Sequence, residues 1–268
     1  RHLYRVTELP WEDEDAYMDI LALGTVCDIM PLTDENRIFV KRGLRRLTNS
    51  TNLGINALKK ALGLDGKPIE VQHLSCRIGP SLNSTGRLES AKEGVELLLT
   101  DDPARAESLA QDMAKLNELR KEMTDRGVRA ATDWVRKDIR MIPTEDGVKE
   151  KKIGDDKVIV LYMPGIHESI AGLIASKLKE AFYRPTLVFT DAENGQGLKG
   201  SGRSIETYNM FDKLCEHKEL FVKVGGHPMA AGFTITREAL EPLREALNRD
   251  CNLTDADLVE KLYVDESC

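Results

Sequence analysis

One histidine lies among very small residues in the segment VGGHPMAAG, residues 224–232. Gly225 and Gly226 precede His227, and mostly small residues follow it. Because glycine readily adopts positive φ, we expect this backbone to expose consecutive N–H groups. The pattern predicts a floor of small residues, on which a sugar-phosphate group lies against backbone donors and one imidazole.

A second glycine-containing segment, GSGRS at residues 200–204, carries one arginine and two hydroxyl groups. We expect its glycines to let a phosphate approach the chain, so that Ser201, Arg203 and Ser204 contact it. The planar guanidinium of arginine matches the oxygens of a phosphate. A twisted edge strand with ordinary polar residues would explain the same pattern without a ligand.

His167 follows a predicted strand and begins the predicted helix in MPGIHESIAGLIASKL. Ligands of open α/β sheets gather at the carboxyl ends of strands, so a histidine at this place can bind phosphate. A capping or packing role for the imidazole is the alternative.

The segment GPSLNSTGRL, residues 79–88, precedes a predicted helix at residues 88–99. We expect Asn83 and Arg87 to present an amide and a guanidinium to an anion at the start of this helix. Simple capping by Ser84 or Thr85 explains the segment equally well.

Asp28 is a single carboxylate among the apolar residues of LALGTVCDIMPL. A buried, ionised carboxylate needs a cation or hydrogen-bond donors, because burial without them costs several kcal/mol. A metal ion is one solution, and capping of the next backbone turn is the other. The spacing alone leaves both interpretations open.

The hydrophobic pattern separates a helical first half from an α/β second half. Apolar residues at helical spacing predict helices at residues 13–23, 36–47, 53–62 and 88–99. Asp102 and Pro103 predict the start of a long helix that continues to about residue 138. Residues 141–156 are charged and lack periodicity, which indicates an exposed loop. From residue 157 onward strands alternate with helices, which predicts a compact α/β domain.

The composition is that of a globular protein, with 41% hydrophobic residues and a formal net charge of −7. This acidic balance argues against a protein that coats nucleic acid along its whole surface. The five cysteines are scattered without a C-x-x-C pair, so we interpret them as reduced. Because no apolar run approaches the roughly 18 residues of a membrane helix, we expect a cytoplasmic protein without membrane association.

In this order, GTVCDIMPL, GPSLNSTGRL, a long helix, HESIAGLIASKL, GSGRS and VGGHPMAAG resemble the bacterial RecJ single-stranded-DNA exonucleases of the DHH phosphoesterase superfamily. The resemblance covers nearly the whole chain. It implies an α/β fold with the C-terminal part of a DHH domain, a long connecting helix and an α/β DHHA1 domain. The expected division is residues 1–100 for the DHH part, 101–140 for the connecting helix, 141–156 for the exposed loop, 157–250 for DHHA1 and 251–268 for the start of a truncated oligonucleotide-binding (OB) domain.

The resemblance also implies roles for single residues. Asp28 matches the family's final metal-ligating aspartate, with Mn²⁺ or Mg²⁺ in a two-metal site, and Asn83 and Arg87 match its anion-handling loop. The positions expected to hold DNA phosphates or the terminal nucleotide match His167, Ser201, Arg203 and His227. The family's earlier Asp-x-Asp and Asp-His-His motifs are expected upstream of residue 1, since neither Asp-x-Asp-Gly nor Asp-His-His occurs in the sequence. We therefore expect a chain that is truncated at both ends and inactive by itself.

The implied function is part of a 5′-to-3′ single-stranded-DNA exonuclease, which hydrolyses phosphodiester bonds with a divalent metal in DNA repair and recombination. Two alternatives are a DHH phosphoesterase acting on short oligonucleotides or dinucleotides, and a non-catalytic nucleic-acid-binding module. The expected partners are single-stranded DNA and either a single-stranded-DNA-binding protein or a RecQ-type helicase. We expect the protein to be a monomer.

Overall fold

The computed structural model describes residues 17–88, 92–137, 139–144, 147–193 and 195–261. Contacts divide the chain into two compact units, residues 1–120 and residues 121–268, which are described separately. Within these described ranges, no helix is both long enough and apolar enough to cross a membrane.

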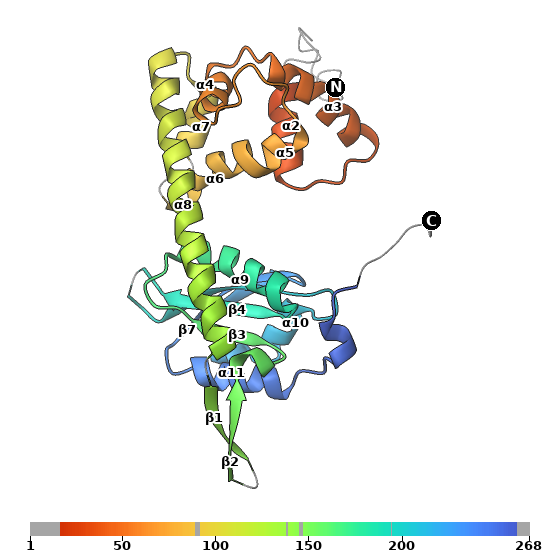
Figure 1. Ribbon diagram of the computed structural model, residues 1–268, viewed down its shortest axis with the longest axis vertical. Coiled ribbons are helices and arrows are strands. Elements are labelled where there is room, and N and C mark those ends of the chain that lie inside the picture. The colour runs from red at the N-terminus through yellow and green to blue at the C-terminus, as the bar shows by residue number, and fades with distance from the viewer. Residues whose placement is uncertain (1–16, 89–91, 138, 145–146, 194, 262–268) are drawn as a thin grey trace. The chain divides into compact units, whose positions relative to one another are not determined.

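The first unit consists of helices around one hydrophobic core (Figure 1). Its helices are α2 (Met18–Cys27), α3 (Asp34–Thr48), α4 (Leu53–Ala61), α5 (Val71–His73), a π-helix (Leu74–Ile78), α6 (Gly79–Leu88), α7 (Lys92–Leu99) and the first part of α8 (Pro103–Lys137). The predicted helices at 36–47 and 53–62 are confirmed as α3 and α4. For the predictions at 13–23 and 88–99, residues 13–16 and 89–91 lie outside the described residues. Residues 18–23 belong to α2 and residues 92–99 form α7, whereas Leu88 is the last residue of α6.

The long helix predicted from residue 103 to about 138 is confirmed as α8. Asp102 caps its start, because the Oδ1 of Asp102 accepts a hydrogen bond from the backbone N–H of Ala104 at 2.9 Å. Leu109 and Met113 of this helix are buried in the core of the first unit. The division between the two units falls inside α8, which therefore contributes residues to both.

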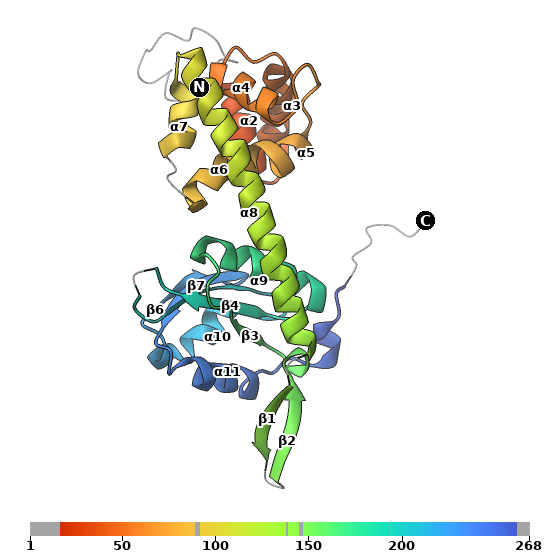
Figure 2. The same ribbon diagram turned by 60° about the vertical axis from the view of Figure 1, so that its left-hand side comes forward.

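The second unit has a five-stranded sheet between two helical layers (Figures 1 and 2). The strand order is β3 (Ile159–Tyr162), β4 (Thr186–Asp191), β5 (Leu198–Arg203), β7 (Ala230–Ile235) and β6 (Lys223–His227). Strands β3 and β4 pair in parallel, and the other pairs are antiparallel. This arrangement confirms the predicted α/β fold.

Each face of this sheet buries its own hydrophobic cluster. On one face, Val188 and its neighbours pack with α9 (Glu168–Phe182) and the second part of α8. On the other face, Phe189 and Phe233 pack with α10 (Met210–Cys215) and α11 (Leu240–Arg249). Because side chains alternate along a strand, residues two apart lie on the same face.

The irregular loop predicted at residues 141–156 is wrong. The structure has an antiparallel hairpin of β1 (Ile139–Thr144) and β2 (Gly147–Lys152), followed by a 3₁₀ turn at Ile153–Asp155. Thr144 is paired with Gly147, so two residues connect the strands. The high charge of the segment concealed the strands. Of residues 251–268, which were expected to begin an OB domain, residues 262–268 lie outside the described residues.

Candidate functional site

Three of the predicted site residues lie on one face of the five-stranded sheet, the face that carries α9. Arg203 on β5 is paired with Ala230 on β7, which is paired with His227 on β6. A parallel row lies two residues away on the same strands, where Ser201 is paired with Gly232 and Gly232 is paired with Gly225. The pairing therefore brings a guanidinium, a hydroxyl and an imidazole to one surface from strands that are far apart in the sequence.

Helix α9 packs on this face over β4 and β5, and its residue Gly172 lies against Arg203 and Ser201. An added Cβ at Gly172 of α9 would lie 3.0 Å from an Nη atom of Arg203 and 3.4 Å from the Cβ of Ser201. Gly172 thus leaves room for the arginine side chain to lie against the helix. Arg203 also donates a hydrogen bond from Nη1 to the carbonyl oxygen of Gly202 at 2.8 Å. Both contacts restrict the position of the guanidinium.

The floor of small residues predicted from VGGHPMAAG is present, but its backbone differs from the prediction. Gly225 and Gly232 are exposed partners on the α9 face, and an added Cβ on either would meet no described atom within 4 Å. Neither they nor Gly226 have positive φ, because all three belong to the paired strands β6 and β7. The prediction of exposed N–H groups at positive φ is therefore wrong. The glycines instead leave a strip of sheet backbone without side chains.

The hairpin between β6 and β7 fixes His227 beside Arg203. Gly226 lies on the opposite face from His227, and its Cβ would be 2.4 Å from the carbonyl oxygen of Ala230. The hairpin tip is held to the rest of the domain, because the backbone N–H of Ser204 donates to the carbonyl of Met229 at 2.9 Å. His227 is exposed. The turn therefore holds an accessible imidazole at the level of Arg203.

The glycines of GSGRS have a packing role that the sequence analysis did not predict. An added Cβ at Gly200 would lie 2.3 Å from the Phe233 ring, and one at Gly202 would lie 2.3 Å from the sulfur of Met210. Both glycines therefore face the core, away from Ser201 and Arg203. The strand is also not an edge strand, since β5 lies between β4 and β7.

Ser204 does not join this surface. Its side chain is 1% exposed, and its hydroxyl donates a hydrogen bond to the carbonyl oxygen of Tyr208 at 2.5 Å. The hydroxyl closes the turn between β5 and α10, so its placement does not support the predicted contact with DNA.

His167 is the N-cap of α9, which was the alternative interpretation of this residue. Its Nδ1 accepts a hydrogen bond from the backbone N–H of Ser169 at 3.3 Å and lies 2.7 Å from the Ser169 hydroxyl. Its Nε2 lies 3.3 Å from the carboxylate of Glu193. The imidazole is thus oriented through both nitrogens, and a phosphate at Nε2 would compete with Glu193.

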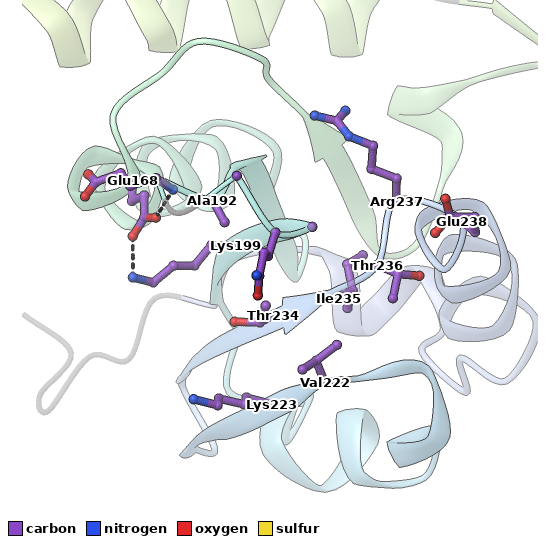
Figure 3. A pocket seen from close by; sticks show the side chains of 14 residues that line it. Glu168, Ala192, Lys199, Val222, Lys223, Thr234, Ile235, Thr236, Arg237 and Glu238 are labelled. Carbon is purple, nitrogen blue, oxygen red and sulfur yellow. Dashed lines mark hydrogen bonds and ion pairs between the residues drawn. The ribbon is translucent and has the colours of Figure 1, made fainter.

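A groove of about 840 Å³ opens on the α9 face beside the start of α9 (Figure 3). Glu168 lies in its wall, where its carboxylate accepts a hydrogen bond from the backbone N–H of Glu193 at 2.7 Å and forms an ion pair with Lys199. Burial raises the pKa of Glu168, but these donors outweigh burial and hold the pKa below its ordinary value. Lys199 was not predicted as a site residue. Its position two residues before Ser201, and therefore on the same face of β5, was its only signal in the sequence.

Asp28, in the first unit, is exposed rather than buried. It is the C-cap of α2, and its backbone N–H donates to the carbonyls of Gly24 and Val26. Leu23 and Val26 before it are buried, whereas Asp28 and the apolar residues after it are exposed, so the carboxylate needs no buried partner. The next residue, Ile29, has a φ of 55°, which is rare for a β-branched residue and marks local strain beside this carboxylate.

The end of α2 lies against the start of α6. An added Cβ at Gly79 would be 2.4 Å from the sulfur of Cys27, so glycine permits this approach one residue before Asp28. A π-helix directly precedes α6, and such segments are frequent at functional sites. The first unit therefore positions Asp28 near the helix that carries Asn83.

The predicted loop around Asn83 and Arg87 is helical, because both belong to α6. The hydroxyl groups of Ser84 and Thr85 do not cap a helix start but donate to the carbonyls of Ser81 and Leu82. The backbone N–H groups of this segment are thus used within the helix. Asn83 is exposed, and Arg87 follows four residues later, with a side chain that lies outside the described residues.

The described residues contain no group of three or more His, Cys, Asp or Glu side chains that could hold a metal ion. Asp28 offers a hard oxygen donor, the type that Mn²⁺ and Mg²⁺ prefer. One carboxylate does not by itself fit a two-metal site, which needs several ligands.

Comparisons with known proteins agree with the arrangement of the second unit. A family described as "DHHA1 domain" matches residues 155–252. The single-stranded-DNA-specific exonuclease RecJ of Bacillus subtilis is 35% identical over 263 residues, which cover 97% of this chain and 31% of that protein. RecJ of Haemophilus influenzae is also 35% identical, over 87% of this chain and 39% of that protein.

Solved structures show the same similarity. The crystal structure of RecJ from Thermus thermophilus in complex with Mg²⁺ matches with a TM-score of 0.76 and 28% identity, covering 92% of this chain and 36% of that one. A crystal structure of exonuclease RecJ bound to manganese matches with a TM-score of 0.74 and 29% identity, covering 92% of this chain and 57% of that one. The chain spans about a third of the length of the curated relatives it matches. Residues 155–252 therefore match the DHHA1 domain family, and the chain as a whole is similar to a segment of RecJ.

Proposed function

We propose that this chain is part of a 5′-to-3′ exonuclease that is specific for single-stranded DNA and hydrolyses phosphodiester bonds with Mn²⁺ or Mg²⁺. The observation that carries the proposal is the open strip of sheet backbone at Gly225 and Gly232, with Arg203, Ser201 and His227 around it. Similarity to proteins named as single-stranded-DNA-specific exonucleases supports it.

In this proposal the strip holds the sugar-phosphate backbone of a single strand. The guanidinium of Arg203 donates to phosphate oxygens, and His227 and Ser201 donate from either side. The bare glycines let the strand approach the sheet more closely than any side chain would allow. All these contacts are to phosphate and sugar, so we expect binding that is insensitive to base sequence and weakened by salt.

Replacement of Arg203 or His227 by Ala should weaken binding of single-stranded DNA. We expect about a tenfold loss for Arg203→Ala, because a charge-assisted hydrogen bond contributes about 1.5 kcal/mol or more, and a smaller loss for His227→Ala. Fluorescence anisotropy with a 5′-phosphorylated dT oligonucleotide would measure both affinities. The slope of log affinity against log salt concentration should fall by about one for Arg203→Ala.

Lys177→Gln provides the matched control for this experiment. Lys177 lies in the same unit on an exposed part of α9, where it pairs with Glu180 at 2.9 Å, and its loss removes one positive charge away from the strip. Its affinity for DNA should equal that of the wild type. Equal affinities for wild type, Arg203→Ala and His227→Ala, with intact circular dichroism spectra, would refute the proposed DNA site.

The metal ligands of the whole enzyme are proposed to lie mostly outside this chain, with Asp28 contributing one carboxylate. The 268-residue chain should then release no nucleotides from single-stranded DNA in the presence of Mn²⁺, because a lone exposed carboxylate is a weak metal site. Thin-layer or gel analysis of labelled DNA would measure release. Robust Mn²⁺-dependent release that Asp28→Ala abolishes would contradict this expectation.

The remaining parts of the proposal concern the cell. We propose action in DNA repair and recombination in the cytoplasm, as a monomer, together with a single-stranded-DNA-binding protein or a RecQ-type helicase.

We also propose that residues 1–100 are the C-terminal part of a DHH domain, and that Asn83 and Arg87 on α6 handle an anion near Asp28. His167 would join the DNA site if phosphate displaced Glu193.

A further inference from the structure

A second row of polar side chains crosses the α9 face of the sheet. Lys199 on β5 is paired with Thr234 on β7, and Thr234 is paired with Lys223 on β6. Each member of this row lies four residues along its strand from its counterpart in the row that contains Arg203 and His227. An even separation places both rows on the same face.

The spacing of the rows follows from strand geometry. Four residues of an antiparallel strand extend about 14 Å. The row of Ser201, Gly232 and Gly225 lies midway, about 7 Å from the row of Arg203 and about 7 Å from the row of Lys199. This step is comparable to the backbone length of one extended nucleotide. Two rows of donors, separated by a row that consists of Ser201 and two glycines, thus match alternate phosphates of a single strand that runs along the sheet strands.

The charges in the second row are unequal. The ammonium group of Lys199 forms an ion pair with Glu168, whose side chain is only 13% exposed, so most of the charge of this lysine is compensated. Lys223 is exposed and has no ion pair with any residue that the structure describes. Lys223 therefore supplies the uncompensated positive charge of this row, while Lys199 and Thr234 supply further hydrogen-bond donors.

The groove of about 840 Å³ includes this row (Figure 3). The side chains of Lys199 and Lys223 extend to the same side, with Thr234 between them. Beyond the row, Arg237 is already engaged, because its Nη1 donates to the Tyr162 hydroxyl at 2.8 Å and its other nitrogen contacts Asp191. Glu193 and Glu238 line the same part of the groove and would repel a polyanion.

We propose that Lys199, Thr234 and Lys223 form a second phosphate subsite, which holds the phosphate two nucleotides along from the one at Arg203 and His227. This inference rests on the proposed function, because it extends the same DNA site. The single strand lies along the sheet over Gly225 and Gly232. Its binding site ends at the part of the groove that Glu193 and Glu238 line. The DHHA1 domain then contacts about three nucleotides, not only a terminal one.

The test compares ligands of different length on the whole chain. The affinities of thymidine 5′-monophosphate and of 5′-phosphorylated dT trinucleotide would be measured by NMR titration for the wild type, Lys223→Gln and Arg203→Ala. Lys223→Gln should weaken trinucleotide binding about fivefold and leave mononucleotide binding unchanged. Arg203→Ala should weaken both. Lys223→Arg should retain trinucleotide affinity, and Lys177→Gln should match the wild type with both ligands.

The outcomes separate this inference from the proposed function. If Lys223→Gln binds the trinucleotide as well as the wild type does, while Arg203→Ala loses affinity, the second subsite is wrong and the first stands. An equal loss for both ligands in Lys223→Gln also overturns the subsite, since a mononucleotide at Arg203 does not reach Lys223. If Arg203→Ala loses no affinity for either ligand, the DNA site itself is wrong and the subsite with it.

Discussion

Gly232→Leu is expected to weaken binding of single-stranded DNA by about 100-fold without unfolding the protein. A leucine there would stand on the strip of bare backbone, between Ser201 and Gly225, and would hold a strand away from both rows of donors at once. The effect should therefore exceed that of Arg203→Ala, which removes only one donor. Anisotropy titrations with the same 5′-phosphorylated dT oligonucleotide would compare the two.

The fold should accept this leucine, because an added Cβ at Gly232 meets no described atom within 4 Å. Glycine in a strand interior is itself unfavourable by roughly 0.5–1 kcal/mol, so the free energy of unfolding should stay equal or rise slightly. Gly225→Leu, on the paired residue of β6, should behave in the same way. Normal DNA affinity in both variants would show that the bare strip is not where a strand binds.

The sequence predicted the alternation of strands and helices in the second unit, where β3 and β4 are short apolar runs. The helix α8 was equally clear, since Asp102 and Pro103 mark its start and its apolar stripe continues for many turns. The β1–β2 hairpin was missed because charged residues outnumber apolar ones in β2. Element type thus followed from local pattern wherever that pattern was apolar.

The candidate site was found by residue type, but its geometry required the strand register. Arg203 and His227 come together only because β7 lies between β5 and β6, and nothing in the spacing of 24 residues reveals this. For the same reason Lys199 and Lys223 were not recognised as neighbours. Register depends on contacts along whole strands, so a one-residue slip would move each of these side chains to the other face.

Burial was the property that the sequence predicted least well. Asp28 lies among apolar residues along the chain and is nevertheless exposed, since it is the C-cap that follows the last residue of α2. Ser204 lies in a polar segment and is buried. In each case burial depends on the direction in which one side chain points, and the packing of the whole unit sets that direction.

Gly200→Ala is expected to lower the free energy of unfolding of the second unit by about 3 kcal/mol, at the upper end of the cost of overpacking a core. The new methyl group would lie 2.3 and 2.8 Å from two atoms of the Phe233 ring and 2.9 Å from the Phe189 ring. Both rings are buried, and their centroids are only 4.8 Å apart, so neither can move without disturbing the other. Urea denaturation followed by circular dichroism, with hydrogen exchange to assign the loss to the sheet, would measure the change.

Gly232→Ala is the control for this prediction, because it adds the same methyl group on the next strand but on the open face. It should leave the unfolding midpoint nearly unchanged, whereas Gly200→Ala should lower it clearly. The pair of variants separates the two reasons for glycine in this sheet: Gly200 makes room for aromatic rings in the core, and Gly232 keeps a surface bare. If Gly200→Ala were as stable as the wild type, the alternation of faces along β5 would be wrong, and with it the placement of Ser201 and Arg203 on the binding surface.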